Sequence, residues 1–211
     1  MKKIGREVLF LPTGERNPRN GEGSMIRLKD GRIMYAYTDY YGTEGDDHAT
    51  ARISAYYSSD EGESWVDGGV LVAKDDEALN IMSVSLLRMQ NGDLGVAYLR
   101  KSMKGENLLC MPYLVRSSDE GKSFSAPVCC AAEDGYYVVN NDRLVRLKSG
   151  RILLPAAYHG ESGLRARAGV LKVLYSDDDG ASWKLSSDTV KSPYDDNIQL
   201  QEPGVYELPD G

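Results

Sequence analysis

A segment of the form Ser-x-Asp-x-Gly-x-x-aromatic occurs three times in this chain of 211 residues. The copies begin at Ser58, Ser117 and Ser176, so consecutive copies are 59 residues apart. A fixed interval of this length is typical of an architecture built from repeated supersecondary units. The repeat therefore limits the possible folds before any chemistry is considered.

A second marker recurs with nearly the same period. Short apolar segments end at a turn glycine four times, with spacings of 61, 58 and 61 residues, at Gly31, Gly92, Gly150 and Gly211. Asp-Gly and Asn-Gly between apolar runs are strong hairpin signals, because such a turn needs positive φ. We therefore expect a hairpin near the start of each unit.

The stretches around these turns are rich in β-branched and aromatic residues and show no long helical period. In the first unit we expect four strands, near residues 24–28, 32–37, 51–57 and 69–73. Four antiparallel strands repeated about every 60 residues predict an all-β fold made of propeller blades.

We expect a single partial propeller domain over residues 1–211. Its blade units should lie at about 20–75, 80–135 and 138–195, with an incomplete unit at 198–211. Such a part cannot close a ring, and open sheet edges favour further pairing. We therefore expect a longer chain or, alternatively, closure by a partner copy.

The net charge of −7 argues against broad binding to nucleic acid or to anionic membranes. No apolar run approaches the ~20 residues of a membrane span, and the run Val8 to Leu11 is too short for a secretory signal. Three cysteines are an odd number, which argues against a disulfide framework. We expect a cytoplasmic protein, or a secreted one if a signal peptide has been removed.

The repeated segment has a local structural explanation. Asp60 can accept hydrogen bonds from backbone N–H groups of its turn, Gly62 supplies a permissive backbone position, and Trp65 can fold back into the core. Turn carboxylates are usually caps rather than catalysts. Calcium binding by residues 177–179 is the alternative, but the ligand spacing of a calcium loop is absent there. We expect neither a metal nor a cofactor.

In an up-and-down blade, successive connections alternate between the two faces. The hairpin turns and the repeated segments therefore share one face, and the starts of the innermost strands lie on the other face near the central axis. Four polar residues stand nine positions before the turn glycines: Glu22, Ser83, Asn141 and Glu202. Their polar neighbours complete the candidate site: Arg19, Asn80, Arg143 and Gln201. Strand starts can also be polar without a function, although polar groups seldom converge without partners.

The loops between the second and third strands lie on the same face. They are long and charged: residues 38–48, 100–107 and 159–167. Charged loops on a rigid scaffold often carry function, so we select Asp39, Arg100 and His159 as candidates for substrate binding. Lys101 and Lys104 are expected on a solvated rim. The two histidines of the chain come from different units and are too few for a metal site.

The three repeated segments resemble the Asp boxes, or BNR repeats, of the sialidase (neuraminidase) superfamily. Three further segments are similar to a bacterial sialidase-like subgroup: Asn80–Ser85, Asn140–Arg143 and Gln201–Gly204. The resemblance implies a six-bladed β-propeller, of which this chain holds about three and a half blades. Sialidases are exo-acting glycosidases in which an arginine triad binds the sugar carboxylate, an aspartate is the acid/base, and a tyrosine activated by a glutamate is the nucleophile.

By this resemblance Asp47 matches the acid/base aspartate, with Asp46 as the fallback, and Glu202 matches the glutamate. As a general acid, Asp47 is expected to have a pKa raised by burial. The remaining triad members and the tyrosine would lie beyond residue 211.

The sequence departs from the family at the arginines. It lacks an Arg-Ile-Pro motif before the first strand, where Arg19 could substitute, and two tyrosines at 40–41 occupy the place of a second arginine. The sugar is therefore open. Arg143 and Arg100 are candidates for a rearranged clamp on a related acidic sugar, and Arg143 could instead form a salt bridge between blades.

We expect a sialidase-like glycoside hydrolase that is exo-acting on sialic acid or a related acidic sugar, with this part alone inactive. The alternative is a non-catalytic glycan-binding or scaffold propeller, because Asp boxes occur in both classes. A polysaccharide lyase is a third interpretation, which would use His159 with Tyr137. The sequence does not indicate an oligomeric state.

Overall fold

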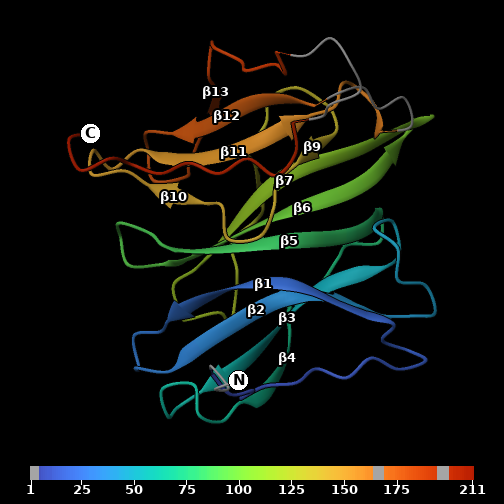
Figure 1. Ribbon diagram of the computed structural model, residues 1–211, viewed down its shortest axis with the longest axis vertical. Helices are drawn as coiled ribbons and strands as arrows, with labels where there is room; N and C mark the ends of the chain where they lie inside the picture. The colour runs from blue at the N-terminus through green and yellow to red at the C-terminus, as the bar shows by residue number, and fades with distance from the viewer. Residues whose placement is uncertain (1–4, 164–168, 194–199) are drawn as a thin grey trace.

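The computed structural model describes residues 5–163, 169–193 and 200–211. Its elements are β-strands in three antiparallel sheets that follow one another along the chain (Figure 1). This is the expected all-β architecture, part of a β-propeller with one sheet per blade. Within the described residues, no helix is long and apolar enough to cross a membrane.

The first sheet has the strand order β1-β2-β3-β4. Its strands are Arg19–Arg27 (β1), Ile33–Tyr40 (β2), Ala51–Ser58 (β3) and Val66–Val72 (β4). All four overlap the expected segments, although β1 begins at residue 19 rather than 24. Because of this earlier start, β1 extends to the end of the sheet where the site was predicted.

The second and third sheets repeat this order. The second contains Ala78–Arg88 (β5), Leu94–Lys104 (β6), Asn107–Ser117 (β7) and Val128–Cys129 (β8). The third contains Tyr137–Val138 (β9), Val145–Arg146 (β10), Ile152–Tyr158 (β11), Val170–Ser176 (β12) and Lys184–Leu185 (β13). Both β9 and β10 pair with β11, so they are two pieces of one interrupted innermost strand.

Apolar side chains fill the spaces between neighbouring sheets. Met34, Ile53 and Leu94 are fully buried between the first and second sheets. Leu114 and Ile152 are fully buried between the second and third. Both faces of the second sheet are therefore covered, which fixes its position between its two neighbours.

Residues 200–211 repeat the hairpin turn but form no strand. The N–H of Gly211 donates to the carbonyl of Leu208 at 3.1 Å, as the N–H of Gly31 does to that of Leu28 at 3.0 Å. The expected innermost strand of a fourth unit is absent over these residues, because no described segment offers it an antiparallel partner. Residues 198–199 of that unit lie outside the described residues.

Each repeated segment folds into the same turn. In the second copy, Ser117 Oγ accepts a hydrogen bond from the N–H of Gly121 at 2.7 Å and donates to Asp119 at 2.7 Å. Asp119 also accepts from the N–H of Ser123 at 2.9 Å. The carboxylate therefore caps its own turn, as expected.

The three consecutive aspartates of the third copy have separate partners. Asp177 pairs with Arg151 at 2.6 Å, whereas Asp178 caps the turn and has its pKa lowered to about 2, chiefly by the hydrogen bond from Ser182. Asp179 pairs with Arg146 at 2.8 Å. Because the three side chains diverge, they do not form the calcium loop considered as an alternative.

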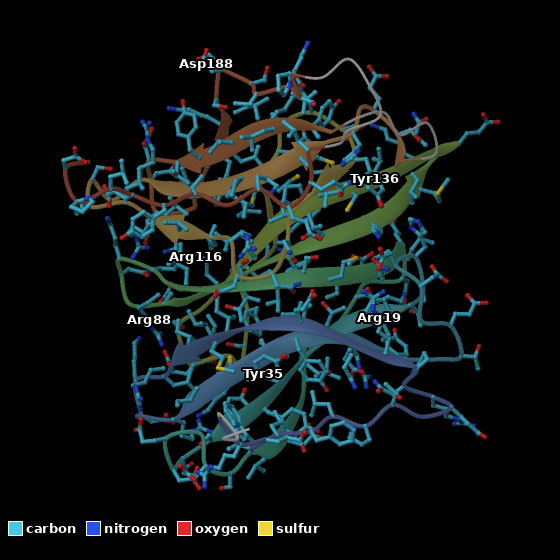
Figure 2. The ribbon with its side chains drawn as sticks, in the orientation of Figure 1. Arg19, Tyr35, Arg88, Arg116, Tyr136 and Asp188 are labelled. Atoms are coloured by element: carbon cyan, nitrogen blue, oxygen red, sulfur yellow. The ribbon has the colours of Figure 1, made fainter. Side chains whose placement is uncertain are left out.

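The two ends of the sheets carry different chemistry. Arg88 and Arg116, which pair with acidic residues of the repeated segments, lie at one end, and Arg19 and Tyr136 lie at the opposite end (Figure 2). The separation of the two faces that was inferred from the order of connections is therefore present in the structure.

The buried serine of the turn should contribute more stability than its neighbour. Ser117→Ala removes a hydroxyl that is 1% exposed and leaves the N–H of Gly121 without its acceptor. We expect a loss of about 1–2 kcal/mol in the free energy of unfolding, measured by urea denaturation. Ser118→Ala, at the exposed adjacent position, is the matched control and should leave that free energy unchanged. Equal losses in the two variants would contradict this role of the turn.

Candidate functional site

A cavity of about 400 Å³ opens at the end of the sheets that carries Arg19 and Tyr136 (Figure 2). Residues from all three sheets and from the segment 200–211 line it. Eight predicted site residues are among them: Arg19, Glu22, Asp47, Ser83, Asn141, His159, Gln201 and Glu202. The cavity is therefore a shared space between blades rather than a pocket within one sheet.

The starts of the innermost strands meet in this cavity. Asn141 Nδ2 donates a hydrogen bond to Glu22 Oε2 at 2.9 Å, although the two residues are 119 positions apart. Asn141 Oδ1 is buried and has no hydrogen-bond partner among the described residues, and Glu202 lines the same cavity. An unpartnered buried acceptor beside a cavity is available to a ligand that carries hydroxyl groups.

The backbone is irregular where these strands enter the site. The pairing register shifts between Asn20 and Gly23 in β1. Ser83, Asp142 and Glu202 adopt left-handed backbone conformations with φ of 58°, 56° and 52°. Bulges and left-handed non-glycine residues change the direction of side chains and are common beside active sites.

Asp47 is held by Arg19 at the rim of the cavity. Arg19 Nη1 lies 2.6 Å from Asp47 Oδ1, and the guanidinium also donates to the carbonyl of Gly45 at 3.3 Å. The guanidinium carbon stands 4.7 Å from the centre of the Tyr40 ring. Arg19 is therefore fixed on three sides by β2 and the loop that follows it.

The charge state of Asp47 differs from the prediction. Its side chain is 60% exposed, and the hydrogen bond from Arg19 lowers its pKa more than partial desolvation raises it. The pKa of Asp47 is therefore below its ordinary value, whereas a general acid at neutral pH needs a raised one. That expectation is wrong for this structure, because it took no account of the contact with Arg19.

Asn80 supports the loop that carries Asp47 without lining the cavity. Its side chain is fully buried, and Nδ2 donates to the carbonyls of Asp47 and Ala49 at 3.0 and 2.9 Å. The structure therefore places Asn80 behind the site, where it ties the first blade to the second. Its position there is a correction to the expected place among the substrate-binding residues.

Two other predicted residues have structural partners away from the cavity. Asp39 is buried and accepts hydrogen bonds from Arg52 and Ser54, both at 2.8 Å. Arg100 pairs with Asp75 at 2.6 Å on the other side of β6 and holds the pKa of that carboxyl at about 2. The structure therefore does not bring Asp39 or Arg100 to the site.

Arg143 lies next to the cavity but does not line it. Its N–H donates to Ser85 Oγ at 2.8 Å, and Nη1 donates to the carbonyl of Asn141 at 3.2 Å. Its guanidinium approaches the backbone at Gly204. These contacts join the second blade, the third blade and the segment 200–211, but none is the predicted salt bridge: among the described residues no carboxylate pairs with Arg143, and its buried Nε has no hydrogen-bond partner.

The aromatic residue beside His159 is Tyr136, not Tyr137. The Tyr136 and His159 rings are 6.2 Å apart and nearly perpendicular, and both line the cavity. Tyr137 is buried in the core, where its hydroxyl donates to the carbonyl of Glu133 at 3.3 Å. The pair proposed for a lyase is therefore not formed. Residues 164–167 of the loop 159–167 lie outside the described residues.

Proteins of known structure share this arrangement of sheets. A Hadza microbial sialidase matches with a TM-score of 0.66 and 13% identity over 82% of this chain and 39% of the sialidase. The intramolecular trans-sialidase from Ruminococcus gnavus, solved in complex with oseltamivir carboxylate, matches with a TM-score of 0.60 and 12% identity, over 85% of this chain and 62% of that one. The chain has the sialidase-like propeller fold.

The same fold extends to other carbohydrate-processing enzymes. The endo-arabinase from Bacteroides thetaiotaomicron matches with a TM-score of 0.59 and 11% identity, over 88% of this chain and 67% of the endo-arabinase. The chain spans less than two thirds of the length of both sialidases. No known family profile matches the sequence. The sialidase-like fold is thus shared by enzymes acting on different sugars.

Lys101 and Tyr136 line the cavity but were not among the predicted site residues. The second sheet, to which β6 belongs, is covered on both faces by neighbouring sheets. Both faces of β6 therefore carry apolar residues, and the alternation of residue types along the strand does not show whether Arg100 or Lys101 faces the site. The paired register places Lys101 opposite Asn80, which is buried. Lys101 itself is 3% exposed, so the expectation that it lies on a solvated rim is wrong.

Removal of Arg19 should release Asp47. In Arg19→Met the pKa of Asp47 should rise toward its ordinary value, because the hydrogen bond that lowers it is lost. Carboxyl-carbon NMR titration measures this directly. The stability that this ion pair contributes is present above the pKa of Asp47 in the unfolded chain, about 4, and is lost as pH falls through the lower pKa of the folded protein. Arg19→Met lacks the pair, so its free energy of unfolding should not show this loss. Arg16→Met, at an exposed position nearby, is the control. An unchanged Asp47 titration in Arg19→Met would contradict the assignment.

Proposed function

We propose that the complete protein is a glycoside hydrolase that removes a terminal acidic sugar, sialic acid or a related one, at this cavity. One observation supports this most. Three carboxylates from different parts of the chain line the same cavity as Arg19: Glu22, Asp47 and Glu202. Glycosidases work through such acidic groups placed around the scissile bond. A cavity of about 400 Å³, lined by three sheets, has room for the end of a saccharide, which exo-action requires.

Arg19 is the group that would recognise an acidic sugar. Its guanidinium binds one carboxylate already, that of Asp47, at 2.6 Å. A sugar carboxylate offers the same planar geometry and could take its place. The trans-sialidase with this fold was solved with oseltamivir carboxylate, a ligand named for such a group, which supports the proposal.

This exchange would prepare Asp47 for proton transfer. With Arg19 engaged by the sugar, Asp47 loses the hydrogen bond that lowers its pKa, and its pKa rises. The negative charge of the sugar carboxylate nearby raises this pKa further, so that Asp47 can hold a proton and donate it to the leaving-group oxygen of the glycosidic bond. Glu202, on the segment 200–211, accepts a proton from the nucleophile or acts as the base.

A non-catalytic glycan-binding propeller is the second candidate. The lowered pKa of Asp47 favours it, because an ionised carboxylate accepts hydrogen bonds from sugar hydroxyls but cannot act as a general acid. The unpartnered Oδ1 of Asn141 would serve either function. A hydrolase and a glycan-binding propeller would both bind the sugar, but only the hydrolase would cleave its glycosidic bond.

Turnover by the complete protein separates them. Asp47→Asn and Glu202→Gln should each lower kcat/KM on a fluorogenic N-acetylneuraminic acid glycoside by about 10²- to 10⁴-fold with the fold intact. Asp46→Asn is the control, because Asp46 is adjacent in sequence but does not line the cavity, and it should retain activity. Unchanged turnover in both test variants would discard the catalytic assignment. Sugar binding without turnover in the wild-type protein would favour the second candidate.

A further inference from the structure

Lys101 is a buried charge in the wall of the cavity. The residue is 3% exposed and lies at the end of β6. Its Nζ donates a hydrogen bond to the backbone carbonyl of Asp47 and stands 5.8 Å from the centre of the Tyr136 ring. Leu99 and Cys110 line the cavity with it, and the same wall carries polar side chains such as Arg19 and His159.

The ammonium group is incompletely compensated. It has three N–H donors, and among the described residues no carboxylate forms an ion pair with it. Partly buried arginines at the other end of the sheets are compensated, since Arg88 pairs with Glu120 and Arg146 with Asp179. A buried charge is costly unless it is paired, so Lys101 lacks the partner that its position calls for.

We propose that Lys101 binds the anionic group of the ligand and thereby sets the preference of the cavity for acidic sugars. This inference rests on the proposed function. Arg19 and Lys101 both contact Asp47, Arg19 at its carboxylate and Lys101 at its carbonyl. A ligand carboxylate that displaces the Asp47 side chain from Arg19 therefore arrives beside a second cation. The burial of Lys101 strengthens this attraction, because charges interact more strongly away from water.

A purely structural role for Lys101 predicts something different. Asn80 donates to the same Asp47 carbonyl and also to that of Ala49, without carrying a charge. If Lys101 only held the loop, its loss would resemble the loss of Asn80 and would affect acidic and neutral ligands alike. If Lys101 binds the anion, its loss affects only the acidic ligand.

Calorimetric titration of the complete protein with matched sugars makes this comparison. The probes are N-acetylneuraminic acid and galacturonic acid, each beside its carboxamide, which differs mainly in charge. Lys101→Met should weaken binding of the acid that the wild-type protein prefers by about 10- to 100-fold and leave binding of its amide unchanged. Asn80→Ala should weaken both members of a pair equally. Lys104→Met removes an exposed charge from the same strand and should change neither.

Lys101→Gln provides a second test if the methionine variant does not fold, because it removes the charge and retains an N–H donor for the Asp47 carbonyl. Retention of the acid preference in the folded Lys101 variants would overturn the inference and leave the proposed function standing. A wild-type protein that prefers neutral arabino-oligosaccharides to both acids, or that binds none of the probes, would overturn the inference together with the proposed acidic substrate.

Discussion

The carboxylates of Glu120 and Asp179 tie each sheet to the one before it. Both residues sit at the left-handed position of a repeated turn, with φ of 60° and 57°. Glu120 pairs with Arg88 of its own blade and accepts a hydrogen bond from the N–H of Lys29, in the hairpin of the preceding blade, at 2.9 Å. Asp179 does the same with Arg146 and with the N–H of Gln90 at 3.0 Å. Because the contact repeats, successive sheets are joined in the same way at this end, and the starts of their innermost strands line one cavity at the other end.

At that convergent end the backbone changes from regular pairing to bulges and left-handed residues. Such conformations are unfavourable for residues with a Cβ and persist only where the surrounding structure holds them. Here they are held by contacts between blades, such as the hydrogen bond from the N–H of Ser83 to Thr38 Oγ1 at 3.1 Å and that from Ser24 Oγ to Asp142 at 2.6 Å. The face of the repeated turns fixes how the sheets are joined, and the opposite face, with its bulges and left-handed residues, directs polar side chains into the cavity. This division of roles explains how one repeated scaffold can hold sites for different sugars.

The fold was predictable because its signals are local and periodic. The repeat units followed from the turn glycines and from the interval between Ser58 and Ser117. The count of nine positions back from the glycines identified Glu22 and Asn141, which are hydrogen-bonded to each other although they are 119 residues apart. The errors concern properties that depend on contacts between segments. Whether Arg100 or Lys101 faces the cavity depends on the pairing register in a sheet covered on both sides. The charge state of Asp47 depends on Arg19, 28 residues away, and no local pattern reveals that contact.

We propose that the starts of successive innermost strands form one sugar-binding cavity. A crystal structure of the complete protein with a bound saccharide tests it most directly. We expect electron density for a sugar ring within the cavity, in contact with Arg19 and Asn141, while Glu22 and Asn141 remain neighbours. A sugar bound at the face of the repeated turns, or Glu22 and Asn141 found far apart, would contradict it.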